Sequence, residues 1–200
     1  MDITNLAVLL IASFFIIIPI FVLFKSKVTG LATYIYVFIC FISGPIWSVS
    51  IVMFRESTSF DDALFWNKII YLVSIFIGAF FYYFSLIYPQ KKKIKIYDLI
   101  LWLWGLVIVY FLYTTDSFVV QVILNDKGNS IKMGIFYYVW AVWLTYMMVS
   151  GQMRMLLALS KLNRFEREQV KYIVLGSIFP AIGTIPTNII MPALGLYEYI

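Results

Sequence analysis

The apolar run ITNLAVLLIASFFIIIPIFVLF, from Ile3 to Phe24, contains no charged residue over 22 positions. A helix of that length extends about 33 Å, which is enough to cross the roughly 30 Å hydrocarbon core of a bilayer. The residues before the run carry no positive charge, and the run is longer than the apolar core of a secretory signal peptide. The sequence therefore predicts a retained first membrane-spanning helix.

Further apolar runs of the same kind follow along the chain. We expect six membrane-spanning helices at about residues 3–24, 31–54, 63–88, 98–115, 134–157 and 169–191, in a single domain over residues 1–200. The composition agrees, because 63% of the residues are hydrophobic and 12% are charged, whereas soluble domains are about half apolar and a quarter charged. We therefore expect an all-α, polytopic bundle of six transmembrane helices, with the lipid bilayer as a partner.

The basic residues are distributed unevenly between the two sets of loops that join the expected spans. One set carries eleven of the 15 Lys and Arg residues and three of the ten acidic residues, a net charge of +8. The other set carries four basic and seven acidic residues, a net charge of −3. Because loops rich in Lys and Arg stay in the cytoplasm, we expect a multi-pass plasma-membrane protein with its N-terminus outside. The basic residues form only short clusters between apolar runs, and we expect no nucleic-acid partner.

The loop between the fourth and fifth expected spans, residues 117–135, has a different pattern. Two runs rich in β-branched residues flank the turn Asn125-Asp126-Lys127-Gly128-Asn129. Such a pattern predicts a β-hairpin, here on the extracellular side. An isolated hairpin is only marginally stable in water, so we expect it to rest on the outer ends of the helices.

The residues that catalysis requires are missing or badly placed. The chain has no histidine, and Cys40 is its single cysteine, so Ser-His catalysis, a histidine phosphoacceptor and an internal disulfide are all excluded for this chain. Every acidic residue lies in a loop or at the end of an expected span, so no pair of carboxylates sits within the bilayer. We expect no catalytic residue, no metal site and no cofactor, and hence no enzyme.

Polar side chains recur within three of the expected spans, in the half that faces outward. They are Trp47 and Ser50 on the second span, Asn67, Tyr71 and Ser74 on the third, and Thr187 and Asn188 on the sixth. The simpler interpretation is that they form hydrogen bonds between helices. The alternative hypothesis is that they line an outward-opening site for a small extracellular ligand, with the hairpin lying across its mouth.

Two pairs of segments carry a family resemblance. The first pair is ALFWNKIIY at residues 63–71 with FFYYFSLIYP at 80–89, and the second is REQVKYIVLG at 167–176 with TNIIMPALGL at 187–196. They resemble the third and sixth spans of the seven-helix N-terminal sensor region of bacterial histidine kinases, and the expected hairpin fits that region too. The resemblance implies a receptor-like sensory module that acts through a cytoplasmic signalling partner or as a homodimer.

The resemblance leaves two questions open. The family region has seven spans, and the seventh would begin near Ile200, so we expect either a fragment of a longer kinase or a truncated relative without an output domain. Six helices in 200 residues would also suit a small substrate-binding component of a membrane transporter. The identity of the ligand and the oligomeric state stay open.

Overall fold

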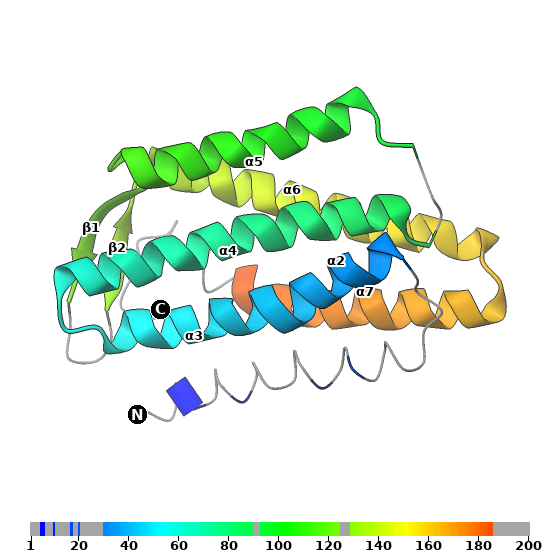
Figure 1. Cartoon of the computed structure of the whole chain (residues 1–200), viewed down its shortest axis with the longest axis horizontal. Helices are drawn as coiled ribbons and strands as arrows, with labels where there is room; N and C mark the ends of the chain where they lie inside the picture. The colour runs from blue at the N-terminus through cyan, green and yellow to red at the C-terminus, as the bar shows by residue number, and fades with distance from the viewer. Residues whose placement is uncertain are drawn as a thin grey trace.

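The computed structural model describes residues 30–89, 93–124 and 129–185, with side chains to residue 178, together with Asn5, Leu6, Leu10, Ile17 and Ile20. Most of these residues lie in long helices that pack side by side, with a two-stranded sheet at one end (Figure 1). Most of the expected first span lies outside the described residues, as does the last part of the sixth. The structure confirms a mostly helical fold with a small antiparallel sheet.

The first long helix runs from Leu31 to Glu56 and changes its winding halfway along. It consists of α2 (Leu31–Val37), a π-helical turn η1 (Phe38–Ser43) and α3 (Gly44–Glu56). Pro45 lies in the first turn of α3, where it has no N–H to donate to the carbonyl four residues earlier. The wider π turn accommodates it, because the Gly44 N–H bonds to the Ile39 carbonyl five residues back. The helix therefore continues past the proline.

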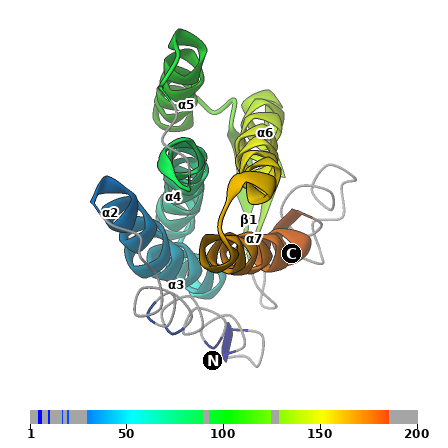
Figure 2. The same cartoon turned by 90° about the vertical axis from the view of Figure 1, so that its right-hand side faces the viewer.

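Helix α4 (Phe60–Ile87) lies at the centre of the bundle. It contacts α3, α5 (Ile96–Thr114) and α6 (Ile135–Ala158), as the end-on view shows (Figure 2). The approach of α6 is close at Gly78, where an added Cβ would lie 2.5 Å from Leu144 Cδ1. Lipid tails are as apolar as the helices, so close packing at small residues holds such helices together.

The last two long helices of the described chain lie at about the positions expected for the fifth and sixth spans. Helix α6 is followed by a short 3-10 turn η2 (Leu159–Lys161) and by α7 (Arg164–Ile185), and α6 contacts α7. In the part of the chain that the structure describes, three helices are long and apolar enough to cross a membrane: Leu31–Glu56, α4 and α5. These three helices indicate that the chain is a membrane protein. The bundle of six spans stays a prediction.

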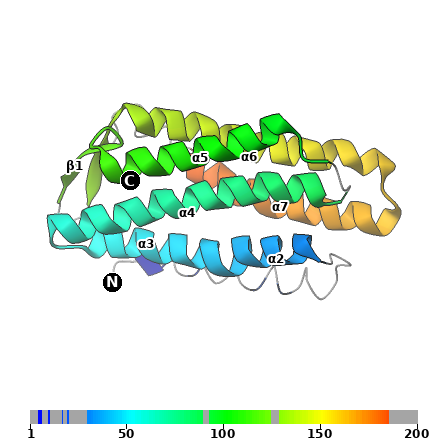
Figure 3. The same ribbon diagram turned by 45° about the horizontal axis from the view of Figure 1, so that its top comes forward.

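The predicted hairpin is present between α5 and α6. Strand β1 (Val119–Ile123) pairs antiparallel with β2 (Ser130–Met133), with Val122 opposite Ile131 and a bulge between Val119 and Gln121. The hairpin lies at the end of the bundle where α3 ends and α4 begins (Figure 3). Its apolar side chains join the main core, namely Phe118, Val119, Val122, Ile131 and Met133. The expectation that the hairpin rests on helix ends is confirmed.

Asn129 ties the hairpin to the end of α3. Its side-chain amide is buried and donates hydrogen bonds to the carbonyls of Phe54 at 2.8 Å and Ser57 at 2.6 Å. The last carbonyls of a helix lack partners within the helix, and Asn129 supplies one. At the same end the side-chain amide of Asn5 donates to the carboxylate of Glu56. Asn5 and the hairpin therefore lie on the same side of the bundle.

The two ends of the bundle differ in charge, and we call them the hairpin end and the basic end. The basic end carries seven cationic residues beside three acidic ones, at the junctions of α4 with α5 and of α6 with α7. They are Lys93, Lys95, Arg154, Lys161, Arg164, Arg167 and Lys171, with Asp98, Glu166 and Glu168. The hairpin end carries Arg55, Lys68 and Lys132 beside Glu56, Asp61, Asp62 and Asp116. The folded chain thus separates the two sets of loops that the charge pattern distinguishes.

Candidate functional site

Three of the predicted site residues share one buried face of α4 near the hairpin end. Asn67, Tyr71 and Ser74 follow one another at helical spacing, and all three are buried. Tyr71 and Ser74 contact residues of α6, and Tyr71 also contacts the hairpin. The three residues therefore form a face of α4 that meets two other elements.

The ring of Tyr71 lies within an aromatic cluster. Its centroid is 4.8 Å from that of Phe118, 4.9 Å from that of Trp140 and 6.0 Å from that of Tyr137. The edge-to-face arrangement of Tyr71 with Trp140 and Tyr137 is a favourable geometry for aromatic pairs. The Tyr71 hydroxyl donates to the sulfur of Met133 on β2 at 3.6 Å. Helices α4 and α6 and the hairpin therefore meet at Tyr71.

The hydroxyl of Ser74 links α4 to α6. It donates to the carbonyl of Tyr71 at 2.7 Å and accepts from the indole N–H of Trp140 at 3.1 Å. An indole N–H buried without an acceptor would cost about 1–3 kcal/mol. Ser74 thus forms a hydrogen bond between helices, as expected under the simpler interpretation of the polar side chains within the spans.

Asn67 has a hydrogen-bonding atom that its described surroundings leave unused. Its side chain is 2% exposed, and its Oδ1 has no hydrogen-bond partner among the described residues. Leaving such an atom unpaired costs about 1–3 kcal/mol. Buried polar atoms without a hydrogen-bond partner are few in native proteins, and each one calls for an explanation. Of the three α4 residues, Asn67 is the one with a buried polar atom that has no partner among the described residues.

The other predicted site residues lie elsewhere. Ser50 is fully buried on α3, and its hydroxyl donates to the Ile46 carbonyl of its own helix at 2.7 Å. Trp47 is partly buried and packs against the core that contains Tyr71. Thr187 and Asn188 lie outside the described residues. The structure therefore brings together the three α4 residues and places Trp47 and Ser50 on the neighbouring helix.

A second polar cluster joins α4, α5 and α6 at the basic end, and the sequence reasoning missed it. The Tyr82 hydroxyl donates to Asp98 Oδ1 at 2.6 Å and accepts from Arg154 Nη2 at 2.6 Å. Arg154 Nη2 is 3.5 Å from the same Asp98 oxygen, and the guanidinium lies 4.6 Å from the centre of the Tyr82 ring. These contacts combine an ion pair with a cation–π interaction.

Asp98 is a buried carboxylate with three partners. Besides Tyr82 and Arg154, it accepts a hydrogen bond from the backbone N–H of Lys95 at 2.8 Å through Oδ2. This contact closes the first turn of α5, where a negative charge interacts favourably with the helix dipole. The side chain is only 4% exposed, and its partners explain how a charge is tolerated there. One sequence signal was available, since an acidic side chain at the third position of a helix can accept from the backbone N–H of the N-cap residue.

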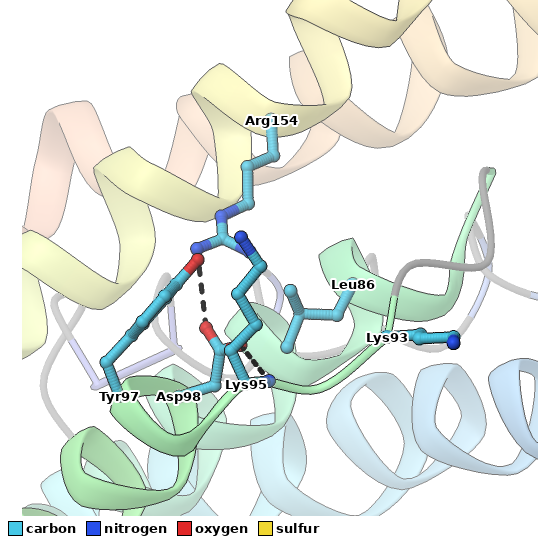
Figure 4. A pocket seen from close by; sticks show the side chains of 6 residues that line it. All are labelled: Leu86, Lys93, Lys95, Tyr97, Asp98 and Arg154. Carbon is cyan, nitrogen blue, oxygen red and sulfur yellow. Dashed lines mark hydrogen bonds and ion pairs between the residues drawn. The ribbon is translucent and has the colours of Figure 1, made fainter.

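A cavity of about 310 Å³ adjoins this cluster (Figure 4). Its lining residues are Leu86, Lys93, Lys95, Tyr97, Asp98 and Arg154. Arg154 reaches into the cavity from α6, while the two lysines lie on the segment that enters α5. Three cationic side chains and one carboxylate therefore meet there. Within the described ranges, no group of three His, Cys, Asp or Glu side chains could hold a metal ion.

Comparison with known protein families gives a match over most of the chain. A family described as the N-terminal 7TM region of histidine kinase matches residues 7–195, which is nearly the whole chain. No curated protein and no solved structure matches the chain. The match includes the segments at residues 63–71, 80–89 and 167–176, and nearly all of the segment at 187–196.

Proposed function

Because the chain belongs to the family of N-terminal 7TM regions of histidine kinases, we propose that it is a sensory module that binds a small ligand at its hairpin end. The family match favours this function over a component of a transporter. The three long apolar helices agree with a membrane location. No enzymatic step is required of this chain, because a sensor changes the arrangement of its helices and another protein or domain carries out the chemistry.

The observation that carries the proposal is the unpaired oxygen of Asn67 beside the aromatic cluster of Tyr71. The cluster contains hydroxyl, amide and aromatic groups and no charged side chain. A ligand for it would be uncharged and largely apolar, with one hydrogen-bond donor for Asn67 Oδ1. Sites of this kind, with apolar walls and a few oriented polar groups, are typical for small molecules.

The hairpin provides a route by which such a ligand would change the helices. It contacts α4 through Met133 and Tyr71 and holds the end of α3 through Asn129. A ligand that binds more tightly when the hairpin is shifted would therefore move both helices. The extent of the change is set by the difference in the ligand's affinity for the two states. Helix α4 then leads without interruption to Tyr82 at the basic end, where α5 and α6 join it. A cytoplasmic signalling partner or a second copy of the chain would respond to the change there.

The proposal requires the hairpin end to face outward and the basic end to face the cytoplasm. The charge separation between the two ends supports this orientation, because positively charged loops are retained in the cytoplasm. The contact of Asn5 with Glu56 places Asn5 at the hairpin end. The N-terminus would then lie outside, with the extracellular ligand reaching the hairpin directly.

A ligand screen with matched variants tests the proposal. The purified chain is melted in detergent with a library of small uncharged amphiphiles, and unfolding is followed by tryptophan fluorescence. A ligand present at 100 times its dissociation constant stabilises the folded state by about 2.7 kcal/mol. For a chain of this size, that corresponds to a rise in Tm of about 5–10 °C. We expect such a rise in the wild type and its loss in Asn67→Leu.

The control for that screen is a serine at the other end of α4. Ser85 is buried and donates to the carbonyl three residues earlier at 2.6 Å, as Ser74 does at 2.7 Å. Ser85→Ala should retain the ligand-induced rise in Tm, because Ser85 lies near the basic end. A rise that persists in Asn67→Leu, or a screen in which no compound stabilises the wild type, would argue that these polar groups only pack helices together.

A further inference from the structure

The cavity at the basic end holds more positive charge than its described surroundings neutralise. Lys93, Lys95 and Arg154 line it together with one carboxylate, Asp98. Both oxygens of Asp98 are already occupied, by the Tyr82 hydroxyl and Arg154 on one side and the Lys95 backbone on the other. Within the described ranges, neither lysine ammonium group has a carboxylate partner. Lys95 Nζ lies 5.6 Å from the centre of the Tyr97 ring, but an aromatic ring does not neutralise a charge. The charge of both lysines therefore remains available to an anion.

The other described acidic residues of the basic end are also engaged. Glu168 accepts a hydrogen bond from Lys171 at 2.8 Å, and this contact lowers the pKa of the Glu168 carboxyl group. Glu166 accepts from the Asn163 backbone N–H at 3.4 Å and takes part in the start of α7. Neither of them lines the cavity. The chain thus presents no second carboxylate to Lys93 and Lys95 from its described residues.

The geometry of the cations points to a phosphate group, and we propose that this cavity binds the headgroup of an anionic phospholipid. Arg154 is held by Tyr82 and Asp98, so its planar guanidinium is oriented before any ligand binds. Arginine and lysine are the side chains that bind phosphate oxygens best. The cavity volume of about 310 Å³ lies within the range of small-molecule sites. This site is separate from the ligand site proposed at the hairpin end.

An exposed apolar stripe on α5 argues for a lipid over a free phosphate ion. Tyr97 lines the cavity and is 45% exposed, and Ile100 and Trp104 continue from it at helical spacing with exposures of 57% and 48%. Helix α5 is long and apolar enough to cross a membrane. An acyl chain could therefore lie along this stripe while the headgroup occupies the cavity. Basic pockets between transmembrane helices on the cytoplasmic side are known to recognise acidic headgroups in this manner.

Lipid titration with a charge-matched pair of variants tests the site. The purified full chain is titrated with phosphatidylglycerol and with phosphatidylcholine, and bound lipid is counted by native mass spectrometry. We expect the wild type to bind phosphatidylglycerol more tightly than phosphatidylcholine. The double variant Lys93→Gln/Lys95→Gln should bind phosphatidylglycerol at least roughly tenfold more weakly than the wild type does. The control Lys161→Gln/Arg164→Gln removes the same charge from exposed positions of the basic end outside the cavity. Its affinity should stay within about twofold of the wild type.

The outcomes of this titration separate the proposal from its alternatives. Both lysines are exposed, so an unchanged Tm in the double variant shows that any loss of binding is local. Equal binding of the two lipids to the wild type would overturn the proposal. So would an equal loss in the control variant, which would indicate a general surface potential. Displacement of phosphatidylglycerol by millimolar inorganic phosphate would also overturn it, because the cavity would then bind the free anion.

Discussion

Replacing Gly134 with alanine should destabilise the protein by at least about 3 kcal/mol, at the upper end of the range for overpacking. An added Cβ would lie 2.0 Å from the carbonyl oxygen of Ser117 and 2.5 Å from its carbonyl carbon. Both are backbone atoms, so no side-chain rotation relieves the contact. Gly134 also donates to the Phe118 carbonyl at 2.9 Å, and the Phe136 N–H donates to the Ser117 carbonyl at 3.1 Å. The substitution would therefore separate the hairpin from the start of α6.

Gly176 provides the control for this substitution. It lies within α7, and an added Cβ there would meet no atom of the described residues within 4 Å. Because alanine is favoured over glycine within a helix by about 1 kcal/mol, Gly176→Ala should leave Tm unchanged or raise it. Thermal unfolding in detergent, followed by far-UV circular dichroism, measures both variants. Equal Tm values for Gly134→Ala and the wild type would contradict the close approach between the two backbone segments.

Asp98→Ala should lower the free energy of unfolding by about 3 kcal/mol, the lower end of the range for breaking a buried ion pair. The change removes the acceptor of the Tyr82 hydroxyl, of the Lys95 backbone N–H and of Arg154. The Arg154 side chain is 21% exposed and remains partly hydrated, which is why we expect the lower end. Denaturant titration measured by tryptophan fluorescence gives the change.

Two further variants distinguish a buried cluster from a general effect of charge. Asp116→Ala removes an exposed carboxylate, and we expect a change within about 0.5 kcal/mol. Adding Arg154→Met to Asp98→Ala should recover part of the lost stability, because the double variant leaves no unpaired guanidinium beside α4. If Asp98→Ala and Asp116→Ala have the same effect, the hydrogen bonds of Asp98 do not stabilise the fold.

The helices were predictable from charge-free runs, but their first residues were not. The third expected span begins at residue 63, whereas α4 begins at Phe60. The difference arises because Asp61 and Asp62 belong to the first turn, where acidic side chains interact well with the helix dipole. Ser59 caps that turn by accepting from the Asp62 N–H at 3.2 Å. A span defined as a run of uncharged residues cannot include a first turn that contains acidic side chains.

The start of α7 differs from expectation for the same reason. The sixth span was expected from residue 169, whereas α7 begins at Arg164. Asn163 caps it by accepting from the Glu166 N–H at 2.9 Å, a contact typical of helix N-termini. The charged residues between Arg164 and Lys171 are helical although they are not apolar. Apolar length therefore underestimates a helix that extends beyond the membrane.

The polar sites were predictable only where a single helix determines them. Helical spacing placed Asn67, Tyr71 and Ser74 on one face, and the structure keeps them buried on that face. The partner of Ser74 could not be predicted, because Trp140 lies 66 positions away along the chain. The cluster at the basic end was missed for the same reason.

The orientation of the chain in the membrane is the claim on which both proposed sites depend. Single cysteines at Val120 and Lys161, in a Cys40→Ala background, test it with a membrane-impermeant thiol reagent on intact cells. Val120 is exposed on the hairpin, and Lys161 is exposed at the basic end. We predict that Val120→Cys is labelled in intact cells and that Lys161→Cys is labelled only after the membrane is permeabilised. Labelling of Lys161→Cys but not of Val120→Cys in intact cells would contradict the account.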